Sequence, residues 1–441
     1  MRLDMGDASR ALGRNAEMIA TADRESSDVE PPIAPAPRHG VRAECALEPK
    51  TVAAIRRKAA LEGCKWDTQV GDLTTLAPFP LVMKRSVWQQ LAVWAEKLTS
   101  EAEVAEKEIS ARRHLLRRLG LPCALQRILT DDAPLTPAAG RVIRFDFHWT
   151  KEGWRISEAN SDVPGGFSEA SHFTSLMAEY FPTLQMTGNP GEAWSGALAS
   201  RAGARGVVAL LSATGYMEDH QVNSFVAARL REQGCATHLA KPEQLHWHNG
   251  QAHLETAWHR GPLDAVIRFY QAEWLARLPR DVGWNYFFRG GKTPVANPPL
   301  AVLSESKRFP LVWDDLETDL PTWRALMPET RDPREAPWSH DDSWLVKTAF
   351  CNNGDTVCIR ELMQLNQWLQ SRLSVFLWPF KWVAQRRFES VPVSTPFGPR
   401  HVCIGVYTVN GGAAGAYARL SEKPLIDFAA VDVAVLIEGD D

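Results

Sequence analysis

The sequence predicts a mixed α/β (α+β) fold, and three patterns along the chain support this class. Residues 86–119 repeat apolar side chains at three- and four-residue steps, which is the period of an amphipathic helix. Residues 141–162 and 404–421 each form two alternating stretches around a short turn, which is typical of β-hairpins. From residue 205 onwards, apolar runs alternate with helical stretches, which favours a small doubly wound α/β unit.

Composition indicates a globular protein without a nucleic-acid or membrane partner. A chain of 441 residues can form two or three domains that each bury a core. The formal net charge of −4 shows no excess of basic residues, so nucleic acid is a poor first guess as a partner. The seven cysteines include no C-x-x-C pair, so we expect reduced thiols. No apolar run approaches the ~20 residues of a membrane span, and no signal-peptide core is present, so we expect a cytoplasmic protein.

The chain is expected to divide into four segments. Residues 1–41 mix charged with small residues and end in PPIAPAP, which predicts a disordered leader. Residues 42–200 hold the long helix and the first hairpin. Residues 201–290 form the small α/β unit, and residues 291–441 form a segment with two notable lysines.

The long helix has recognisable start and stop signals. Ser86 and Gln89 are spaced as a capping box, and Gly120 with Pro122 ends the pattern. Its apolar stripe is packing surface and predicts no chemistry.

The first hairpin is the most informative part of the sequence. Residues 151–153 suit a three-residue loop with Gly153 in the left-handed conformation, so that Thr150 faces Trp154. Counting back from that loop places acidic side chains directly opposite each other, at positions where a hairpin core would hold apolar ones.

The predicted register puts Asp146 opposite Glu158 and Arg144 opposite Asn160, all on one face. Directly opposed carboxylates destabilise a strand pair unless something compensates them. Carboxylate and amide oxygens suit a hard divalent cation, and Arg144 could hold an anion beside it. The alternative is a hairpin with a merely polar solvent face, but such faces seldom place two carboxylates in register.

Two nucleotide-binding signatures are absent from the α/β unit. The chain contains no G-x-G-x-x-G, so a dinucleotide site is unsupported. The segment GGKTP at 290–294 resembles part of a P-loop. A P-loop would need glycine where Tyr286 stands and a helix where Pro294 stands, so we reject it.

The last segment carries a different phosphate-binding pattern. Lys307 precedes an apolar segment, and Lys347 ends a strand that leads into the loop TAFCNNGDT. A second strand is expected at 357–362, so that the loop could cover phosphates with backbone N–H groups and a lysine. The alternative for Lys347 is a solvated residue at a strand end. The strand at 382–391 is of the kind that lines an adenine pocket.

Together these residues resemble the circularly permuted ATP-grasp ligases, in particular the glutathionylspermidine synthase-like branch. The resemblance runs from about residue 75 to the C-terminus. It is carried by RFDFHW…SEANSD and IGVYTVNGGAAGAYARLS, which match an R-x-D, an E-x-N and a late G-x-A-x-G-x-x-x-R pattern. The order of segments is also the same: the metal-type hairpin, a small α/β (pre-ATP-grasp) domain, then a lysine-bearing subdomain.

The resemblance implies roles for particular residues. Magnesium would be bound by Asp146, Glu158 and Asn160, and Arg144 would stabilise the transferring phosphoryl group. ATP would be held by Lys307, Lys347, Gln385 and the loop around Gly354. This chain departs from the family at Thr348, where proline is usual, and in CNNGDT, which replaces an Arg- and Glu-bearing loop.

The expected activity is therefore that of an ATP- and Mg2+-dependent ligase. It would join a small-molecule carboxylate to an amine through an acyl phosphate. A phosphotransferase on the same ATP platform and an inactive nucleotide-binding paralogue are the alternatives.

Overall fold

The computed structural model describes residues 39–70, 73–213, 215–350 and 356–438. The chain separates into two units, residues 1–36 and 37–441, and the description concerns the second. The leader expected at 1–41 therefore lies almost wholly outside the described residues, as does Gly354. The boundaries expected near residues 200 and 290 stay predictions.

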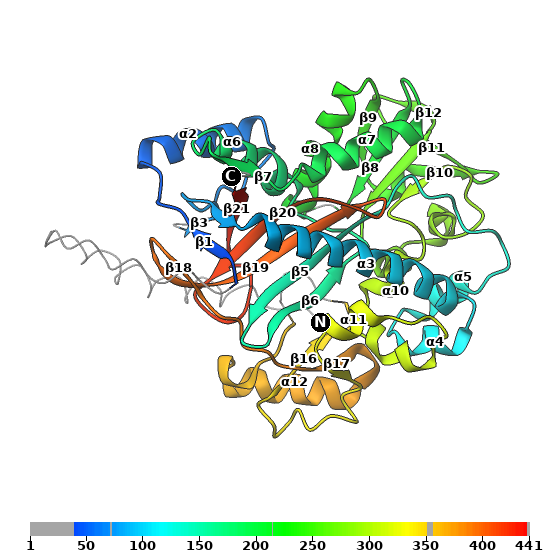
Figure 1. Cartoon of the computed structure of the whole chain (residues 1–441). Coiled ribbons are helices and arrows are strands. Elements are labelled where there is room, and N and C mark those ends of the chain that lie inside the picture. Colours follow the sequence, from blue (N-terminus) through cyan, green and yellow to red (C-terminus); the bar gives the residue numbers. More distant parts are fainter. Residues whose placement is uncertain (1–38, 71–72, 214, 351–355, 439–441) are drawn as a thin grey trace, which may run out of the picture. The chain divides into compact units, whose positions relative to one another are not determined.

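The fold is a mixed α/β arrangement, as the sequence predicts (Figure 1). The largest sheet in the described ranges has nine strands, in the order β1-β4-β21-β20-β19-β5-β6, with β18 beside β19 and β7 beside β21. Its strands are β1 Val41–Ala43, β4 Leu81–Met83, β5 Val142–Thr150, β6 Gly153–Asn160, β7 Leu184–Met186, β18 Val393–Thr395, β19 Gly398–Val409, β20 Gly412–Ser421 and β21 Val431–Glu438. The hairpin expected at 404–421 is formed by β19 and β20, with Asn410 and Gly411 at positive φ in its turn.

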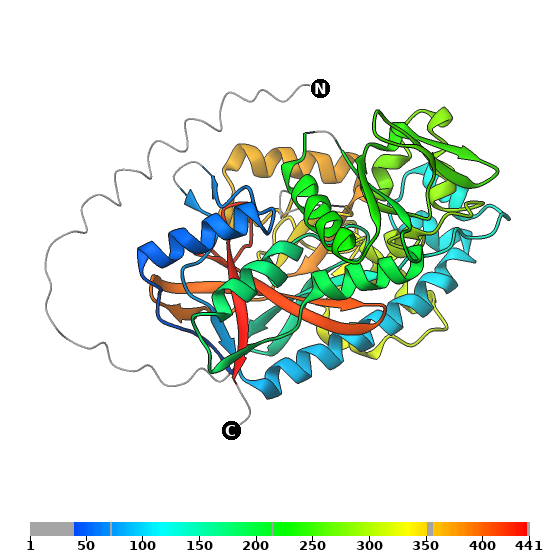
Figure 2. The same cartoon turned by 90° about the horizontal axis from the view of Figure 1, so that it is seen from above.

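Alternation along β5 and β19 divides this sheet into two different faces. Phe145 and Val406 point into a core that contains the buried side of α3 (Arg85–Ser110). Figures 1 and 2 show α3 running beside the β19–β20 hairpin, which it contacts. Arg144 and Tyr407 belong to the opposite face. Because side chains two apart share a face, the apolar face fixes where the polar one lies.

The long helix differs from the prediction at both ends. Its N-cap is Lys84, and Ser86 lies inside the first turn, so the expected capping box does not form. The helix ends at Ser110 because Arg112 takes an extended backbone conformation, and a separate helix, α4, spans Arg113–Arg118. The apolar period continues across this break, which is why the sequence suggested a single helix.

A parallel sheet in the order β14-β13-β8-β9 forms the small α/β unit. Between β9 and β13 the chain adds an antiparallel sheet, β10-β11-β12, which the sequence did not predict. The segment GGKTP leads into strand β14 and not into a helix, which agrees with rejecting a P-loop. The strands and the crossover helix are β8 Val207–Ser212, α8 Met217–Glu232, β9 Ala236–Ala240, β10 Leu245–His248, β11 Gln251–Glu255, β12 Arg260–Pro262, β13 Ala265–Phe269 and β14 Val295–Ala296.

The lysine-bearing segment forms a smaller sheet, in the order β15-β17-β16. Its elements are β15 Thr330–Arg331, β16 Trp344–Thr348, α12 Leu365–Leu377 and β17 Trp382–Arg386. The strand expected at 357–362 is wrong. Only a single bridge joins Cys358 to Val346, and β16 pairs with β17 instead. Pairing with a partner more than thirty residues away depends on tertiary packing, which local pattern does not reveal.

Further helices and the two-stranded sheet β2-β3 lie between these sheets in the sequence. They are α2 Pro49–Leu61, β2 Gln69–Val70, β3 Leu73–Thr74, α5 Cys123–Leu129, a π-helical turn Glu169–Phe173, α6 Thr174–Ala178, α7 Pro190–Ala202, α9 Ala272–Leu275, α10 Ala301–Glu305 and α11 Pro321–Leu326. Among the described residues, no helix has both the length and the apolar character needed to cross a membrane.

A buried ion pair joins the end of the first hairpin to the parallel sheet. Asp162 accepts hydrogen bonds from both terminal nitrogens of Arg268 on β13, and both side chains are 1% exposed. The Asp162 carboxylate also accepts the backbone N–H of Ala272 at 2.8 Å. Asn297 adds bonds to the carbonyls of Val142 and Ser161. The candidate site is thereby held against the α/β unit.

We predict that Asp162→Ala destabilises the fold, because it leaves the Arg268 charge buried without its partner. The expected loss is about 3–5 kcal/mol in the free energy of unfolding, measured by chemical denaturation. Lys151→Ala is the control, since it breaks the exposed ion pair with Glu389 and should change stability little. Equal effects of the two substitutions would contradict the assignment.

Candidate active site

The hairpin β5–β6 has the predicted register at its polar end. Asp146 lies opposite Glu158, and Arg144 lies opposite Asn160. Nearer the turn the prediction is wrong, because Thr150 pairs with Gly153 and the loop is one residue shorter than expected. The register shifts between Asp146 and Phe147, so β6 carries one extra residue there, Ser157. This bulge restores the predicted pairing at the site.

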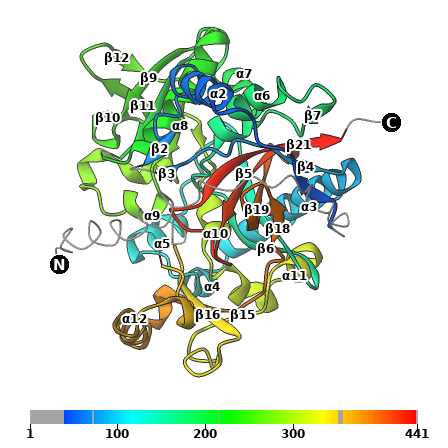
Figure 3. The same ribbon diagram turned by 90° about the vertical axis from the view of Figure 1, so that its left-hand side faces the viewer.

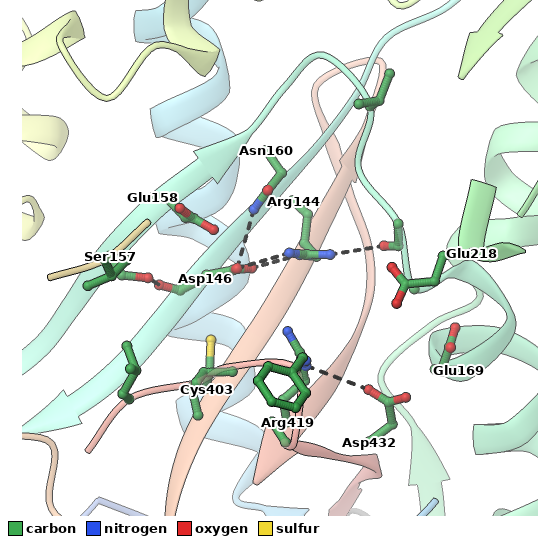
Figure 4. Close-up of a pocket in the computed structure, with 18 of the residues that line it drawn as sticks. Arg144, Asp146, Ser157, Glu158, Asn160, Glu169, Glu218, Cys403, Arg419 and Asp432 are labelled. Atoms are coloured by element: carbon green, nitrogen blue, oxygen red, sulfur yellow. Dashed lines mark hydrogen bonds and ion pairs between the residues drawn. The ribbon is translucent and has the colours of Figure 1, made fainter. Parts of the chain in front are cut away.

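Arg144 is held by several contacts on the polar face. Its Nε and Nη2 donate to the two oxygens of Asp146 at 2.7 and 3.0 Å. Nη1 donates to the carbonyl of Gly165 at 3.1 Å, and the guanidinium lies over the ring of Tyr417. The amide nitrogen of Asn160 donates to Asp146 at 3.3 Å, as Figure 4 shows. Arg144 therefore has a defined orientation and is not a loose surface cation.

Glu158 lies among basic side chains from distant parts of the chain. Lys307 Nζ is 3.4 Å from its carboxylate and 3.2 Å from that of Glu305. Burial alone would raise the pKa of Glu158. Lys307, Lys347 and Arg144 together outweigh that effect and lower the pKa to about 2. The protein itself thus supplies part of the compensation that the sequence argument assigned to a metal ion.

Both predicted lysines reach the hairpin. Lys307 follows α10, and its backbone N–H donates to the carbonyl of Ala349, just beyond β16. Lys347 lies on β16, and its Nζ donates to the carbonyl of the bulge residue Ser157 at 2.9 Å. Both residues are buried. The alternative of a solvated lysine at a strand end is therefore wrong for Lys347.

Gln385 lies on the neighbouring strand β17, opposite Leu345 and two residues along from the partner of Lys347. Its amide nitrogen donates to the hydroxyl of Thr330 at 3.0 Å, and the side chain is buried. Gln385 and Lys347 line the same cavity as the hairpin residues. Gly354 lies outside the described residues.

A cavity of about 770 Å3 opens over the polar face of the hairpin (Figure 4). It is lined by all the predicted site residues that the structure describes except Lys307. Lys307 lines an adjoining small cavity together with Glu158 and Gln385.

The far side of the large cavity belongs to the α/β unit and is acidic. There, burial raises the pKa of Asp219 to about 7 and that of Glu273 to about 8.

A second charged cluster in the cavity was missed by sequence reasoning. Lys65 Nζ lies 2.6 Å from Glu169, 3.0 Å from Asp67 and 3.1 Å from Asp432. Burial would lower the pKa of Lys65, but the three carboxylates outweigh it and raise the pKa well above its usual value. Arg419 lies 3.8 Å from Asp432, its partner on the neighbouring strand. Three segments far apart in the chain therefore meet here. No local sequence pattern predicts such a cluster.

Two tyrosines behind Arg144 were also missed, although a signal for them exists. Tyr407 donates to the carbonyl of Gly165, and Tyr417 lies against Arg144. A Cβ on Gly166 would come within 2.6 Å of the Tyr407 hydroxyl, so position 166 needs glycine for this close approach. Alternation along the 404–421 hairpin would have placed Tyr407 and Tyr417 on the polar face.

The donor set is chemically suited to Mg2+. Asp146, Glu158 and Asn160 present carboxylate and amide oxygens on one wall of the cavity. Magnesium is commonly held by one or two carboxylates together with substrate phosphates, which matches two acids and an amide beside a large cavity. Within the described ranges, no three His, Cys, Asp or Glu side chains gather as a metal cluster. The coordination shell of Mg2+ would therefore need further oxygen atoms from substrate phosphates.

Comparison with solved structures identifies the fold. The structure resembles a glutathione synthetase-like effector (GSS30) from Globodera pallida, with a TM-score of 0.54 and 12% identity, covering 88% of this chain and 97% of that one. A putative gamma-glutamylcysteine synthetase from Methylobacillus flagellatus KT matches with a TM-score of 0.40 and 11% identity, over 73% of this chain and 86% of that one. No curated protein matches the sequence.

The fold is of the ATP-grasp type, and the family follows from the sequence. The model of the glutathionylspermidine synthase pre-ATP-grasp family matches residues 74–438, most of the chain. The protein belongs to this family, so the suspected resemblance is confirmed. Family membership supports a ligase that joins a carboxylate to an amine.

Proposed function

We propose that the protein is an ATP- and Mg2+-dependent carboxylate–amine ligase. The γ-phosphoryl group of ATP would pass to a substrate carboxylate, releasing ADP and giving an acyl phosphate. An amine nitrogen would then attack the acyl carbon, lose a proton, and displace phosphate to leave an amide. Activation is necessary because a carboxylate is a poor acceptor for amines.

One observation carries this proposal most directly. Arg144, Asp146, Glu158 and Asn160 lie on one wall of the cavity. Lys347 from the neighbouring sheet lines the same cavity and donates to the carbonyl of Ser157, next to Glu158. Phosphoryl transfer needs positioning and neutralisation of charge more than covalent chemistry from the protein. This set of residues offers both.

We assign each residue a task that is compatible with its contacts. Asp146, Glu158 and Asn160 would hold Mg2+, which neutralises phosphate charge when bound. Lys307 and Lys347 are compact cations suited to phosphate oxygens, and both already lie beside the hairpin. Gln385 lies on the strand whose backbone would meet the adenine edge. Arg144 would stabilise negative charge that develops on the transferring group.

The decisive experiment measures ADP release with and without candidate amines, in the presence of ATP, Mg2+ and a panel of small carboxylic acids. Amine-dependent ADP with amide formation supports a ligase. Acid-dependent ADP that needs no amine indicates a phosphotransferase, and tight ATP binding without turnover indicates an inactive paralogue. Glu158→Gln is the matched control, because it keeps the size of the side chain but removes a metal-binding charge, and it should abolish turnover.

We predict that Lys307→Ala and Lys347→Ala each weaken ATP binding by roughly ten- to a hundredfold, because a charge-assisted bond contributes about 1.5–3 kcal/mol. Isothermal titration calorimetry with a non-hydrolysable ATP analogue measures the effect. Lys292→Ala is the control, since Lys292 is exposed and belongs to the rejected GGKTP motif. A larger loss of ATP affinity in Lys292→Ala would contradict the assignment of the ATP site to β16.

We also predict that Arg144→Lys lowers kcat by about two orders of magnitude with little change in the KM for ATP, as for loss of a donor that acts in the transition state. Lysine keeps the charge but cannot reproduce the two-pronged contact with Asp146 together with the bond to Gly165. Steady-state kinetics on the amine-dependent reaction test this. A near-normal kcat would show that Arg144 serves only as an ion-pair partner of Asp146 and not in the transition state.

A further inference from the structure

A second carboxylate shares Lys307 with Glu158, one of the residues proposed to hold Mg2+. Lys307 Nζ lies 3.2 Å from Glu305 Oε1 and 3.4 Å from Glu158 Oε2. The lysine side chain is 2% exposed, so these contacts are largely removed from bulk water. One ammonium group therefore lies between two acids, and of the two acids it is Glu158 that lines the large cavity.

Glu305 is fixed in place by the backbone that follows the hairpin. Its Oε2 accepts the N–H groups of Ser161 and Asp162 at 2.6 and 3.0 Å, and these two residues come directly after Asn160. Glu305 is the last residue of α10, which contacts β6, as can be followed in Figures 1 and 3. The carboxylate thus uses one oxygen for the backbone and presents the other to Lys307.

This arrangement matters when Glu158 binds a cation. Lys307 competes with any such cation for the Glu158 carboxylate, because two positive charges at one carboxylate repel each other. The charge of Lys307 is buried, so it needs another anion once Glu158 serves as a metal ligand. Glu305 already lies within hydrogen-bond distance of Lys307 and is held there by the backbone.

We propose that Glu305 is a positioning residue that draws Lys307 away from Glu158 and so leaves this carboxylate available to Mg2+. Glu305 acts through the lysine and is not itself a ligand of the ion. Held in this way, Lys307 also stays beside the hairpin, where it is assigned to phosphate oxygens. The inference rests on the proposed function, since it requires the metal site at Asp146, Glu158 and Asn160.

The substitution Glu305→Gln separates the two contacts of this side chain. Both backbone N–H groups bond to one oxygen, which glutamine retains, whereas an amide NH2 in place of the other oxygen cannot accept a hydrogen bond from Lys307. The probe is Mn2+ alone, which takes the same kinds of oxygen ligand as Mg2+ and is followed by electron paramagnetic resonance. We expect Glu305→Gln to bind Mn2+ about tenfold more weakly than the wild type, as for loss of a residue that supports a metal ligand.

Glu101→Gln is the matched control. Glu101 lies on α3 and also accepts two successive backbone N–H groups, those of Thr322 and Trp323. In the described part of the chain it lines neither the large cavity nor the small one that contains Lys307. The control should leave the Mn2+ affinity unchanged. The circular dichroism spectra of both variants should match that of the wild type, because each keeps an oxygen for its backbone contacts.

A double-mutant cycle tests whether Glu305 acts through Lys307. Lys307→Ala alone should bind Mn2+ more tightly than the wild type, because a competing cation is gone. In that background Glu305→Gln should change the Mn2+ affinity by less than about twofold, since the partner through which it acts is absent. An equal tenfold loss in both backgrounds means that Glu305 acts on the ion directly, and it overturns the proposal.

The remaining outcomes separate this inference from the proposed function. If the wild type binds Mn2+ and Glu305→Gln binds it equally well, the inference is wrong and the metal site stands. If the wild type binds no Mn2+, the metal site of the proposed function is wrong and the inference falls with it.

Discussion

The site depends on one constraint: a charge removed from water needs an opposite charge or a strong hydrogen bond nearby. Asp146 satisfies it with Arg144 from its own strand, whereas Glu158 needs Lys307 from more than a hundred residues away. The same constraint applies to Asp162 and Arg268, which tie the hairpin to the parallel sheet. The large sheet is therefore joined to the parallel sheet by the Asp162–Arg268 pair, and to the small sheet by the hydrogen bond from Lys347 to Ser157.

The bulge at Ser157 sets the positions of the charged side chains that satisfy this constraint. One extra residue in β6 turns its carbonyl toward Lys347, which donates to it at 2.9 Å. The same residue restores the pairing of Asp146 with Glu158. A bulge thus sets both the position of a lysine from another sheet and the register of the carboxylates, which is a common use of bulges beside active sites.

The cavity is lined by residues from two different sheets. Arg144, Asp146 and Glu158 lie on strands of the large sheet, packed on α3. Lys347 and Gln385 lie on the small β15-β17-β16 sheet, whose own core is held by Trp344, Trp368 and Trp382.

Local pattern by itself determined the strands β5, β6, β19 and β20 and the face that carries Arg144 and Asp146, because alternation and turn chemistry act over few residues. It misjudged the loop at 151–153, and the register at the site survived only because of the bulge. Tertiary structure alone decided that β16 pairs with β17 and that Lys65 meets Glu169 and Asp432. Those contacts join distant segments whose pairing depends on the packing of the whole fold, and no short-range periodicity encodes it.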